Sequence, residues 1–378
     1  DACGGKDVPS LVEVRPHTSG WLSSMHSLTK GLMRAVKTNG TLLTPPMRSW
    51  VSSEQCYARD LSCFFEGLAP TCDAYRHPEG GAGVNEVTQL PFGTSNDETG
   101  AVYLKFPDWV DEREEHRAIG VGTPAFYEGL IPKEFQHIGW LGWSSHLVSF
   151  LFRPNRLMRT ELLRRLRLSG LGNALQIYNG VEARYKASSS PPVIGMHVRR
   201  GDACEDSIRT GRLCSPLSSY MVHARKVRQA TGATIIFIAT DSEGVLNETR
   251  PYIEEGFTFL RMSEPLDALH KLATVNQGQV RTREGKPSTI WDDVLRHNLE
   301  EGRVDDNRQV AWEATLDAYL LSFCDVLIGK HTSNLFRVAY ELKAARCDCA
   351  PPFVSLDAPW CFDWGVFAGR SPIGNFPC

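Results

Sequence analysis

The sequence predicts an α/β fold in which parallel strands alternate with helices. Three short apolar runs, at 193–198, 235–239 and 325–329, have the length and composition of buried strands. Apolar residues at helical spacing accompany these runs, within 218–229, 312–323 and 335–342. Strands that alternate with helices indicate a parallel sheet with helices packed on its faces.

The N-terminal region repeats this alternation. A strand is expected at 11–15, then a helix striped by apolar residues from Leu22 to Val36, then a strand at 41–43. The loop at 19–21 contains a glycine, so it either brings backbone close to a ligand at the helix N-terminus or is an ordinary tight turn.

Two later segments are predicted from their periodicity and polarity. Apolar spacing indicates helical structure over roughly 145–167. The segment 277–308 is polar and charged with only a short helical patch, so it is expected to be exposed.

At 378 residues the chain exceeds a single ordinary core, so two domains are expected. The polar, proline-rich stretch that ends at residue 192 marks the boundary. We predict an N-terminal α/β domain at 1–190, a C-terminal α/β domain at 191–360 and a short tail at 361–378. Within the first domain, 45–99 is rich in cysteine, glycine and turn formers, which indicates an excursion tied by disulfides.

Composition and charge exclude several classes of protein. The formal net charge of −3 argues against a general nucleic-acid binder. No run approaches the ~18 apolar residues of a membrane-spanning helix, so any membrane anchor is expected outside this sequence. Eleven cysteines, without the paired spacing of a zinc site, and two glycosylation sequons, at Asn39 and Asn247, favour the secretory pathway.

Motifs of the common nucleotide-binding folds are missing from the sequence. No GxGxxG follows a predicted strand and no GxxxxGK[ST] is present, so a dinucleotide cofactor and a P-loop are not supported. There is no Asp-x-Asp that would chelate a metal on a diphosphate, and the acidic pairs at 292–293 and 305–306 are expected at the surface. These observations favour an anionic ligand whose charge the protein itself balances.

Charged residues gather where the first predicted strand of the C-terminal domain ends. The run PPVIGMHVRRGD closes that strand with His197, Arg199, Arg200 and Asp202. Ligands bind outside the carboxyl ends of strands in open α/β sheets, and the planar guanidinium suits phosphate or carboxylate. The alternative is structural, with one arginine paired to Asp202 and the other at the surface. An adhesion motif at 200–202 is disfavoured because it begins at a strand end.

Polar side chains also follow the other two strands. Asp241 and Ser242 come after the second strand. After the third, Thr332 or Ser333 is a suitable N-cap for a helix whose free amides form an anion seat, although a plain capped helix has the same sequence. Asp317 lies among the apolar residues of the preceding helix. The strand ends are therefore predicted to form one site for an anionic group such as a diphosphate.

These residues resemble the fucosyltransferases that carry an HxRR signature, most closely the α-1,6 (core) enzymes. The similarity rests on four stretches in the same order: VIGMHVRRGD at 193–202, SYMVH at 219–223, IATD at 238–241 and SNLFRVAYE at 333–341. Leu316-Asp317 and Leu321-Ser322 continue it. Weaker similarities extend it through most of the chain, at 20–35, 86–91 and 148–154.

The resemblance implies a GT-B-like fold, with two facing α/β domains. The C-terminal domain would be Rossmann-like and hold GDP-fucose, and the N-terminal domain would lie on the acceptor side. Carried over by position, Arg199 would hold the β-phosphate, Arg200 would support it, and His197 and Asp317 would read the guanine. The remaining donor-binding residues implied by the resemblance are Asp241, Ser242, Thr332 and Ser333.

The resemblance also places a catalytic carboxylate in the loop after the two arginines. Glu205 and Asp206 are the favoured bases and Asp202 is a third candidate, and the sequence does not choose among them. The loop departs from the family because it is longer, because Ala203 stands where a lysine is expected, and because it carries Cys204 and Cys214, which can form a disulfide.

The predicted function is transfer of fucose from GDP-fucose to a glycan, with inversion at the anomeric carbon and without a metal ion or other cofactor. The expected acceptor is the core GlcNAc of an N-glycan or glycopeptide, joined by an α-1,6 linkage. Alternatives are another oligosaccharide, a protein hydroxyl, or an inactive protein that binds GDP or glycan. The expected location is the Golgi lumen, with the full-length protein a type II membrane protein, and no nucleic-acid partner is expected.

Overall fold

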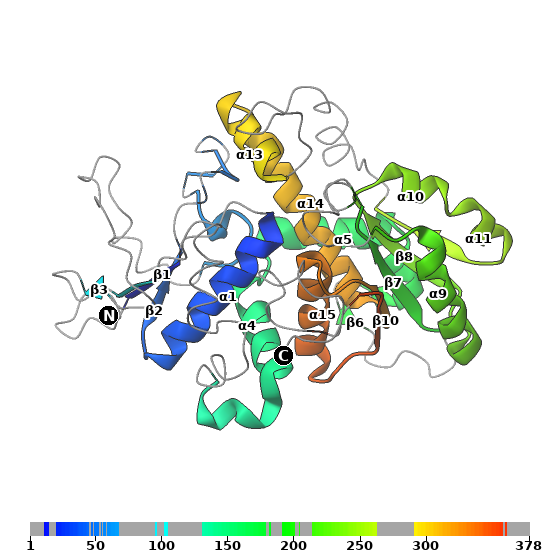
Figure 1. Cartoon of the computed structure of the whole chain (residues 1–378), viewed down its shortest axis with the longest axis horizontal. Coiled ribbons are helices and arrows are strands. Elements are labelled where there is room, and N and C mark those ends of the chain that lie inside the picture. The colour runs from blue at the N-terminus through cyan, green and yellow to red at the C-terminus, as the bar shows by residue number, and fades with distance from the viewer. Residues whose placement is uncertain are drawn as a thin grey trace.

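The computed structural model describes residues 11–14, 20–44, 47, 49–52, 54, 56–57, 59–67, 95–96, 102–104, 131–178, 181–182, 191–200, 204, 214–262, 291–357 and 360. These residues form two main sheets with helices between and around them (Figure 1). Three candidate bases, Asp202, Glu205 and Asp206, lie outside the described residues, as do the tail at 361–378 and most of the predicted excursion at 45–99.

The C-terminal sheet has five parallel strands in the order β11-β10-β7-β8-β9. The strands are β7 (Val193–Val198), β8 (Ile235–Thr240), β9 (Thr258–Leu260), β10 (Val326–Gly329) and β11 (Phe353–Ser355). The chain enters at the central strand β7, moves outward to β9, and then crosses to the other side of β7. This is the strand order of a Rossmann-like sheet, with its switch point between β7 and β10. The predicted α/β class and the Rossmann-like sheet are confirmed.

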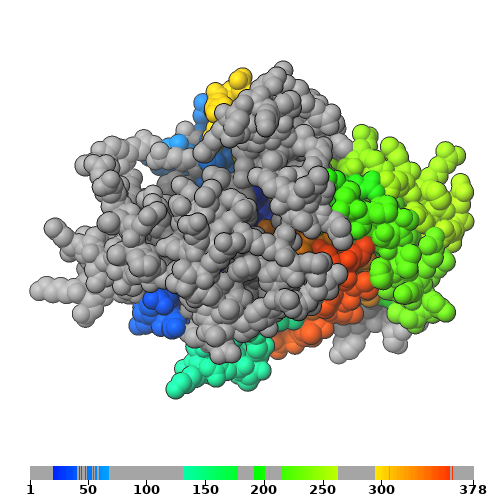
Figure 2. Space-filling view, in the orientation of Figure 1, coloured from blue at the N-terminus to red at the C-terminus, as the bar shows by residue number. Residues whose placement is uncertain are grey.

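Helices cover both faces of this sheet (Figure 1). On one face α9 (Leu217–Thr231) and α10 (Glu243–Asn247) pack on Ile194, Met196 and Val198, and α11 (Arg250–Glu254) follows at the periphery. On the other face α14 (Val304–Phe323) and α15 (Asn334–Cys347) pack on alternate strand residues such as Val193 and Phe237. All six residues of β7 are buried, which explains the continuous apolar run in the sequence. Residues 214–262 form one end of the molecule (Figure 2).

The N-terminal sheet has the order β2-β1-β4-β3. Its strands are β1 (Leu11–Val14), β2 (Thr41–Leu43), β3 (Ser95–Asn96) and β4 (Val102–Leu104). Strand β1 pairs in parallel with β2 and β4, whereas β3 is antiparallel. Helix α1 (Trp21–Lys37) connects β1 to β2 and buries the predicted apolar stripe from Leu22 to Leu32, whereas Val36 at its end is 40% exposed. The predicted strand–helix–strand unit is therefore confirmed.

Short elements connect the two sheets: η1 (Leu61–Cys63), η3 (Lys133–Ile138), α4 (Gly139–Leu151), α5 (Arg156–Leu168), α6 (Leu171–Leu175), the hairpin of β5 (Ile177–Tyr178) and β6 (Val181–Glu182), and α13 (Trp291–Glu300). One apolar core joins α1, α4, α5, α14 and α15. The predicted domain limits at 190 and 360 stay predictions, because 183–190 and 361–378 lie outside the described residues.

The helical periodicity predicted over 145–167 is confirmed. It belongs to two helices, α4 and α5, because Pro154 interrupts the helix and the Asn155 side chain caps α5 by accepting from the Met158 N–H at 3.0 Å. The expectation for 277–308 is wrong in its described part, 291–308. That part is not simply exposed, because α13 buries Val294 and Leu295. That helix has few apolar residues, so its polar composition gave no sign in the sequence that one of its faces is packed.

A buried polar contact joins α1 to α15. The His26 ring lies between Asn334 Oδ1 and Glu341 Oε2, at 2.9 Å from each. Arg337 also donates to Asn334 Oδ1, which identifies that atom as the acceptor oxygen of the amide. His26 and Glu341 are only 4% and 0% exposed, so the contact is shielded from water. This contact holds the N-terminal helix against the first turns of α15.

We expect His26→Ala to lower the free energy of unfolding by about 3–5 kcal/mol, because it leaves the Glu341 carboxylate buried without its partner. Urea unfolding followed by circular dichroism measures this loss. His146→Ala on α4 is the matched control, because that side chain is 46% exposed. The double variant with Glu341→Gln should lose less than the sum of the two single variants, and simple additivity would contradict the coupling.

Candidate active site

The carboxyl ends of β7, β8 and β10 lie side by side at the switch point. The strand register pairs Val198 with Thr240 and Met196 with Ile328. The residues that follow these strands therefore meet at one edge of the sheet: Arg199, Asp241 and Lys330. This is the edge where open α/β sheets bind ligands. The structure thus brings together strand ends that are more than 130 residues apart in the sequence.

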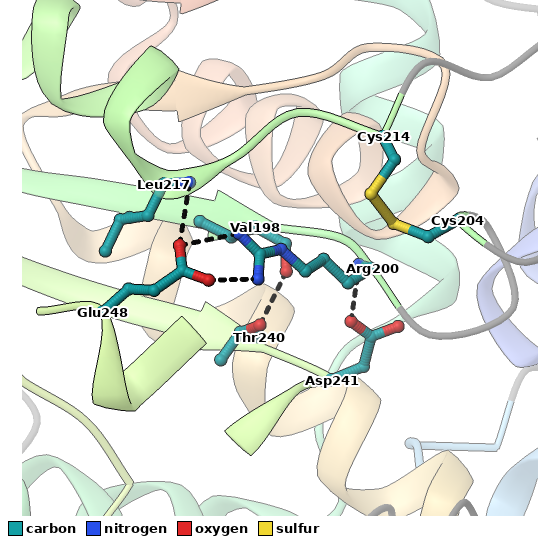
Figure 3. The surroundings of a disulfide bond; sticks show 8 residues. All are labelled: Val198, Arg200, Cys204, Cys214, Leu217, Thr240, Asp241 and Glu248. Carbon is teal, nitrogen blue, oxygen red and sulfur yellow. Dashed lines mark hydrogen bonds and ion pairs between the residues drawn. A yellow bond between two sulfur atoms is a disulfide. The ribbon is translucent and has the colours of Figure 1, made fainter. Parts of the chain in front are cut away.

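The Asp241 carboxylate links the ends of β7 and β8. The Arg199 guanidinium donates to Asp241 Oδ2. The Arg200 backbone N–H donates to Asp241 Oδ1 at 2.8 Å (Figure 3). The Arg199 side chain is 22% exposed, so part of its guanidinium still reaches solvent. Arg199 is therefore oriented by the Asp241 carboxylate at the edge of the sheet where the strands end.

The neighbouring arginine has a different partner. The Arg200 guanidinium donates to both oxygens of Glu248, and Glu248 Oε2 also accepts from the Leu217 N–H at 3.2 Å (Figure 3). The hydrogen bond from Arg200 lowers the pKa of the Glu248 carboxyl. This pair ties the end of β7 to the start of α9. The structural alternative for the RRGD run named Asp202 as the partner, which lies outside the described residues. The structure pairs Arg200 with Glu248 and Arg199 with Asp241.

The predicted disulfide between Cys204 and Cys214 is confirmed, with the two Cα atoms 4.9 Å apart. Cys204 also donates its backbone N–H to the Arg200 carbonyl at 3.2 Å. The disulfide therefore closes the loop that carries Glu205 and Asp206 at a fixed point beside the Arg200–Glu248 pair (Figure 3). Two further disulfides join Cys56 to Cys63 and Cys347 to Cys349.

His197 is the second-last residue of β7, just before the site, and is 3% exposed. Its ring stacks on Phe336 of α15, with centroids 6.3 Å apart and planes 12° from parallel. Burial lowers its pKa to about 4, with Asp241 acting in the opposite direction and Arg199 and Lys330 lowering it further. The imidazole is therefore neutral at physiological pH. Its Nδ1 makes no hydrogen bond to any residue in the described ranges, which leaves it for a ligand.

Asp317 lies on α14 with 6% of its surface exposed. Burial raises the pKa of its carboxyl well above the ordinary range; Glu313 raises it further and Arg165 opposes the shift. Arg165 donates to Glu313 at 3.0 Å, and no recorded hydrogen bond joins Asp317 to another described residue. A buried carboxyl of this kind suits a ligand that brings its own N–H donors.

The third strand end is organised by Asp357, which sequence reasoning missed. Its carboxylate accepts from the His331 N–H at 3.0 Å and from the Thr332 hydroxyl. Ser333 is the N-cap of α15, but within the described chain its side chain makes no capping hydrogen bond. The helix start for which the anion seat was predicted thus lacks a side-chain cap from Ser333, and Thr332 is held by Asp357. Asp357 follows β11, so only its place after a strand would have signalled it.

Glycine at 329 lets α15 begin close to the strand. A Cβ at this position would lie 2.4 Å from the Phe336 ring, which no side chain tolerates. The first turn of α15 is thereby held over the strand ends and against His197. Ser242 is the N-cap of α10 and is partly exposed at the end of β8.

No helix among the described residues is both long and apolar enough to cross a membrane. In the same part of the chain, His, Cys, Asp and Glu side chains do not form a group of three or more that could hold a metal ion.

A sequence relative supports the resemblance to the fucosyltransferases. The alpha-(1,6)-fucosyltransferase of Drosophila melanogaster is 26% identical over 222 residues, which are 57% of this chain and 27% of the relative. The chain thus spans about a quarter of the length of this curated relative. No protein-family model matches the chain. The resemblance predicted from the motifs is confirmed by a match over more than half of the chain.

Solved structures of fucosyltransferases are also similar. NodZ from Bradyrhizobium is 14% identical, with a TM-score of 0.41 over 88% of this chain and 92% of that chain. POFUT1 in complex with GDP-fucose is 9% identical, with a TM-score of 0.44 over 92% of this chain and 97% of that chain. Both TM-scores are below 0.5, so these similarities carry no argument about function.

We expect Asp317→Asn to raise the melting temperature at pH 7 by about 2–4 °C for each kcal/mol gained, because the amide is neutral without the cost of holding a proton on a buried carboxyl. The sign follows from linkage: the raised pKa means that the folded chain holds a proton that the unfolded chain releases above the ordinary value of 3.8. The free energy of unfolding should therefore fall as pH rises from 3.8 towards the raised pKa, and less so in the variant.

Thermal unfolding at pH 5 and pH 7 measures both effects. Glu301→Gln, at an exposed position, is the matched control and should change neither. A lower melting temperature for Asp317→Asn at pH 7 would mean that the carboxylate stabilises the fold, against this assignment.

Proposed function

We propose that the chain transfers fucose from GDP-fucose to a glycan by an inverting, metal-independent reaction. The observation that carries the proposal is Arg199 at the switch point of a Rossmann-like sheet, with His197 and Asp317 buried beside it. The 26% identity to an alpha-(1,6)-fucosyltransferase supports the choice of donor.

The guanine would be read by the two buried polar groups. The Asp317 carboxylate would accept from the N–H donors of the guanine edge, and these donors replace the water that burial removed. The neutral His197 ring would contribute the second polar contact. A carboxyl whose pKa is raised by burial gains a partner only when the base is bound, so guanine binding and ionisation of Asp317 are coupled.

The diphosphate would lie on Arg199 and the uncapped amides of α15. Cleavage of the bond between fucose C1 and the phosphate oxygen leaves new negative charge on GDP, and donors fixed in advance stabilise this charge as it develops. Ser333 would border the same seat from the helix start. Arg200 would act indirectly through Glu248, and Thr332 through Asp357.

The acceptor hydroxyl needs a base, and the closed loop after Cys204 supplies Glu205 and Asp206. One of these carboxylates would take the proton as the acceptor oxygen attacks C1 from the face opposite GDP, which inverts the anomeric centre. Asp241 and Ser242 would border the donor pocket from the end of β8.

We further propose the core GlcNAc of an N-glycan as acceptor, with an α-1,6 linkage, and the Golgi lumen as location. Support comes from the similarity to an alpha-(1,6)-fucosyltransferase and from three disulfides, which form in oxidising compartments. Another oligosaccharide or a protein hydroxyl is the alternative acceptor. An inactive GDP- or glycan-binding protein is the alternative to an enzyme, because the loop departs from the family.

We expect Arg199→Ala to lower the rate of GDP release from GDP-fucose by about 100- to 1,000-fold, because it removes one donor to the developing charge. GDP is measured with EDTA present, with and without a biantennary N-glycopeptide that ends in GlcNAc. Arg225→Ala on α9 is the matched control, because its partner Glu255 holds it at the surface.

Near-normal turnover of Arg199→Ala would refute the assignment of the site. Acceptor-stimulated release with EDTA present would support the enzyme, the donor and metal independence together. GDP binding without any release, unchanged by Glu205→Ala and Asp206→Ala, would favour the inactive binding protein.

A further inference from the structure

A buried arginine beside Asp317 has one nitrogen whose N–H groups the described chain does not use. Arg165 lies near the end of α5 and is 6% exposed. Its Nε donates to Glu161 Oε1 at 2.6 Å and its Nη2 donates to Glu313 Oε1 at 3.0 Å, so its charge is compensated. Its Nη1 is buried and makes no hydrogen bond to any residue in the described ranges. Because buried donors in proteins almost always have an acceptor, this nitrogen is suited to a ligand that supplies one.

Arg165 lies close to Asp317 because α5 packs against α14 (Figure 1). Glu313 and Asp317 are four residues apart on α14, so they lie on the same face of that helix. The guanidinium that binds Glu313 also opposes the rise that burial causes in the pKa of Asp317. Neither a hydrogen bond nor an ion pair joins Arg165 to Asp317 directly, although both belong to the described chain. The two groups are therefore near each other without being partners.

Both groups lie towards the carboxyl edge of the C-terminal sheet. The charge of Asp241, at the end of β8, also raises the pKa of Asp317, which places this carboxyl within electrostatic range of the strand ends. A Cβ at Gly170, just after α5, would lie 3.7 Å from the side chain of Leu260, the last residue of β9. The last turn of α5 therefore reaches the edge where open α/β sheets bind their ligands.

His197 approaches the same region from the sheet itself. Residues 194, 196 and 198 of β7 pack towards α9. The alternate residues point to the opposite face, which α14 and α15 cover, and His197 is one of them because its ring stacks on Phe336 of α15. Asp317, on α14, belongs to this same face. A base held by Asp317 would therefore lie between α14, the end of β7 and the end of α5.

The edge of a purine that carries an acceptor beside two donors fits Arg165 and Asp317 together. An ionised carboxylate only accepts hydrogen bonds and a guanidinium only donates them. The guanine edge presents the C6 carbonyl oxygen, the N1–H and the C2 amino group in a row. Adenine presents an amino group at C6 and an unprotonated N1, so it would set a donor against the arginine and an acceptor against the carboxylate.

We propose that Arg165 Nη1 donates a hydrogen bond to the C6 carbonyl oxygen of the guanine and thereby excludes adenine from the nucleotide site. This inference rests on the proposed function, in which Asp317 accepts from the N–H donors of the same edge. It gives a helix outside the C-terminal sheet, α5, a part in choosing the nucleotide. The structural alternative is that Arg165 only compensates Glu161 and Glu313, and that water accepts from Nη1.

The test compares the dissociation constants of GDP and 6-thio-GDP, in which sulfur, a weak acceptor, replaces the C6 oxygen. Titration calorimetry on the purified chain measures both. Arg165→Lys keeps a cation for Glu161 and Glu313 but loses the planar fork that carries Nη1. We expect it to weaken GDP binding by about 10- to 100-fold, as for loss of one charge-assisted hydrogen bond, and 6-thio-GDP binding by less than about threefold. Arg164→Lys is the matched control and should leave both constants unchanged, because Arg164 binds the same Glu161 from a side chain that is 39% exposed.

Unchanged GDP binding in Arg165→Lys would overturn the inference, and so would an equal loss of GDP and 6-thio-GDP binding, because a purely structural role weakens both ligands alike. If Arg165→Lys does not fold, Arg165→Met combined with Glu313→Gln, which removes the buried ion pair from both sides, gives the same comparison. The proposed function is judged separately on the unaltered chain, where equal affinity for GDP and ADP would contradict the guanine site. A preference for GDP over ADP that is undiminished in Arg165→Lys would leave the proposed function standing and overturn this inference alone.

Discussion

The carboxylate of Asp241 is the interaction on which the arrangement of the site depends. It receives the Arg199 guanidinium on one oxygen and the Arg200 backbone N–H on the other, so it fixes where β7 ends and how the two arginines leave it. Successive residues of an extended chain point to opposite sides, and Arg200 accordingly reaches Glu248 near α9. Arg199 thus stays at the edge where the strands end, and Arg200 stabilises the scaffold. Two like charges can be adjacent here because each has its own carboxylate.

Helix α15 carries the second constraint, because three separate contacts fix its first turns. Gly329 allows Phe336 to approach the strand, and Phe336 in turn packs against His197. Asn334 and Glu341 are held by His26 from α1. The N-terminal sheet and the anion seat are therefore connected through one helix. A shift of α1 would move the amides at the helix start directly, without passing through the C-terminal sheet.

Much of this could be predicted from the sequence, because local patterns determine local structure. The buried strand β7 is found at the residues where its apolar run predicted it, and the disulfide at Cys204 follows from two cysteines that flank one loop. The break at Pro154 was missed because helical spacing continues on both sides of it. Hydrophobic periodicity reports which face is buried and does not report where a backbone donor is lost.

The partners of the site residues were not predictable in the same way. Glu248 and Asp357 lie 48 and 25 residues from the groups that they hold, Arg200 and Thr332. Such pairs are selected by strand order and helix placement, and no spacing rule in the sequence encodes them. The burial of Lys330, which is 5% exposed, was not predictable for the same reason. A lysine after a predicted strand is expected at the surface unless the elements that cover it are known.

The closed loop at Cys204 and Cys214 has a consequence for how this protein could diversify. The two ends of this loop are joined by one disulfide, with the two Cα atoms 4.9 Å apart, so both are fixed at one place on the scaffold. Insertions there need not disturb the Arg200–Glu248 pair or the strand behind it. The residues between the two cysteines could therefore be exchanged, in evolution or by engineering, without altering the rest of the sheet edge. Such an exchange would change the surface that the protein presents to other molecules.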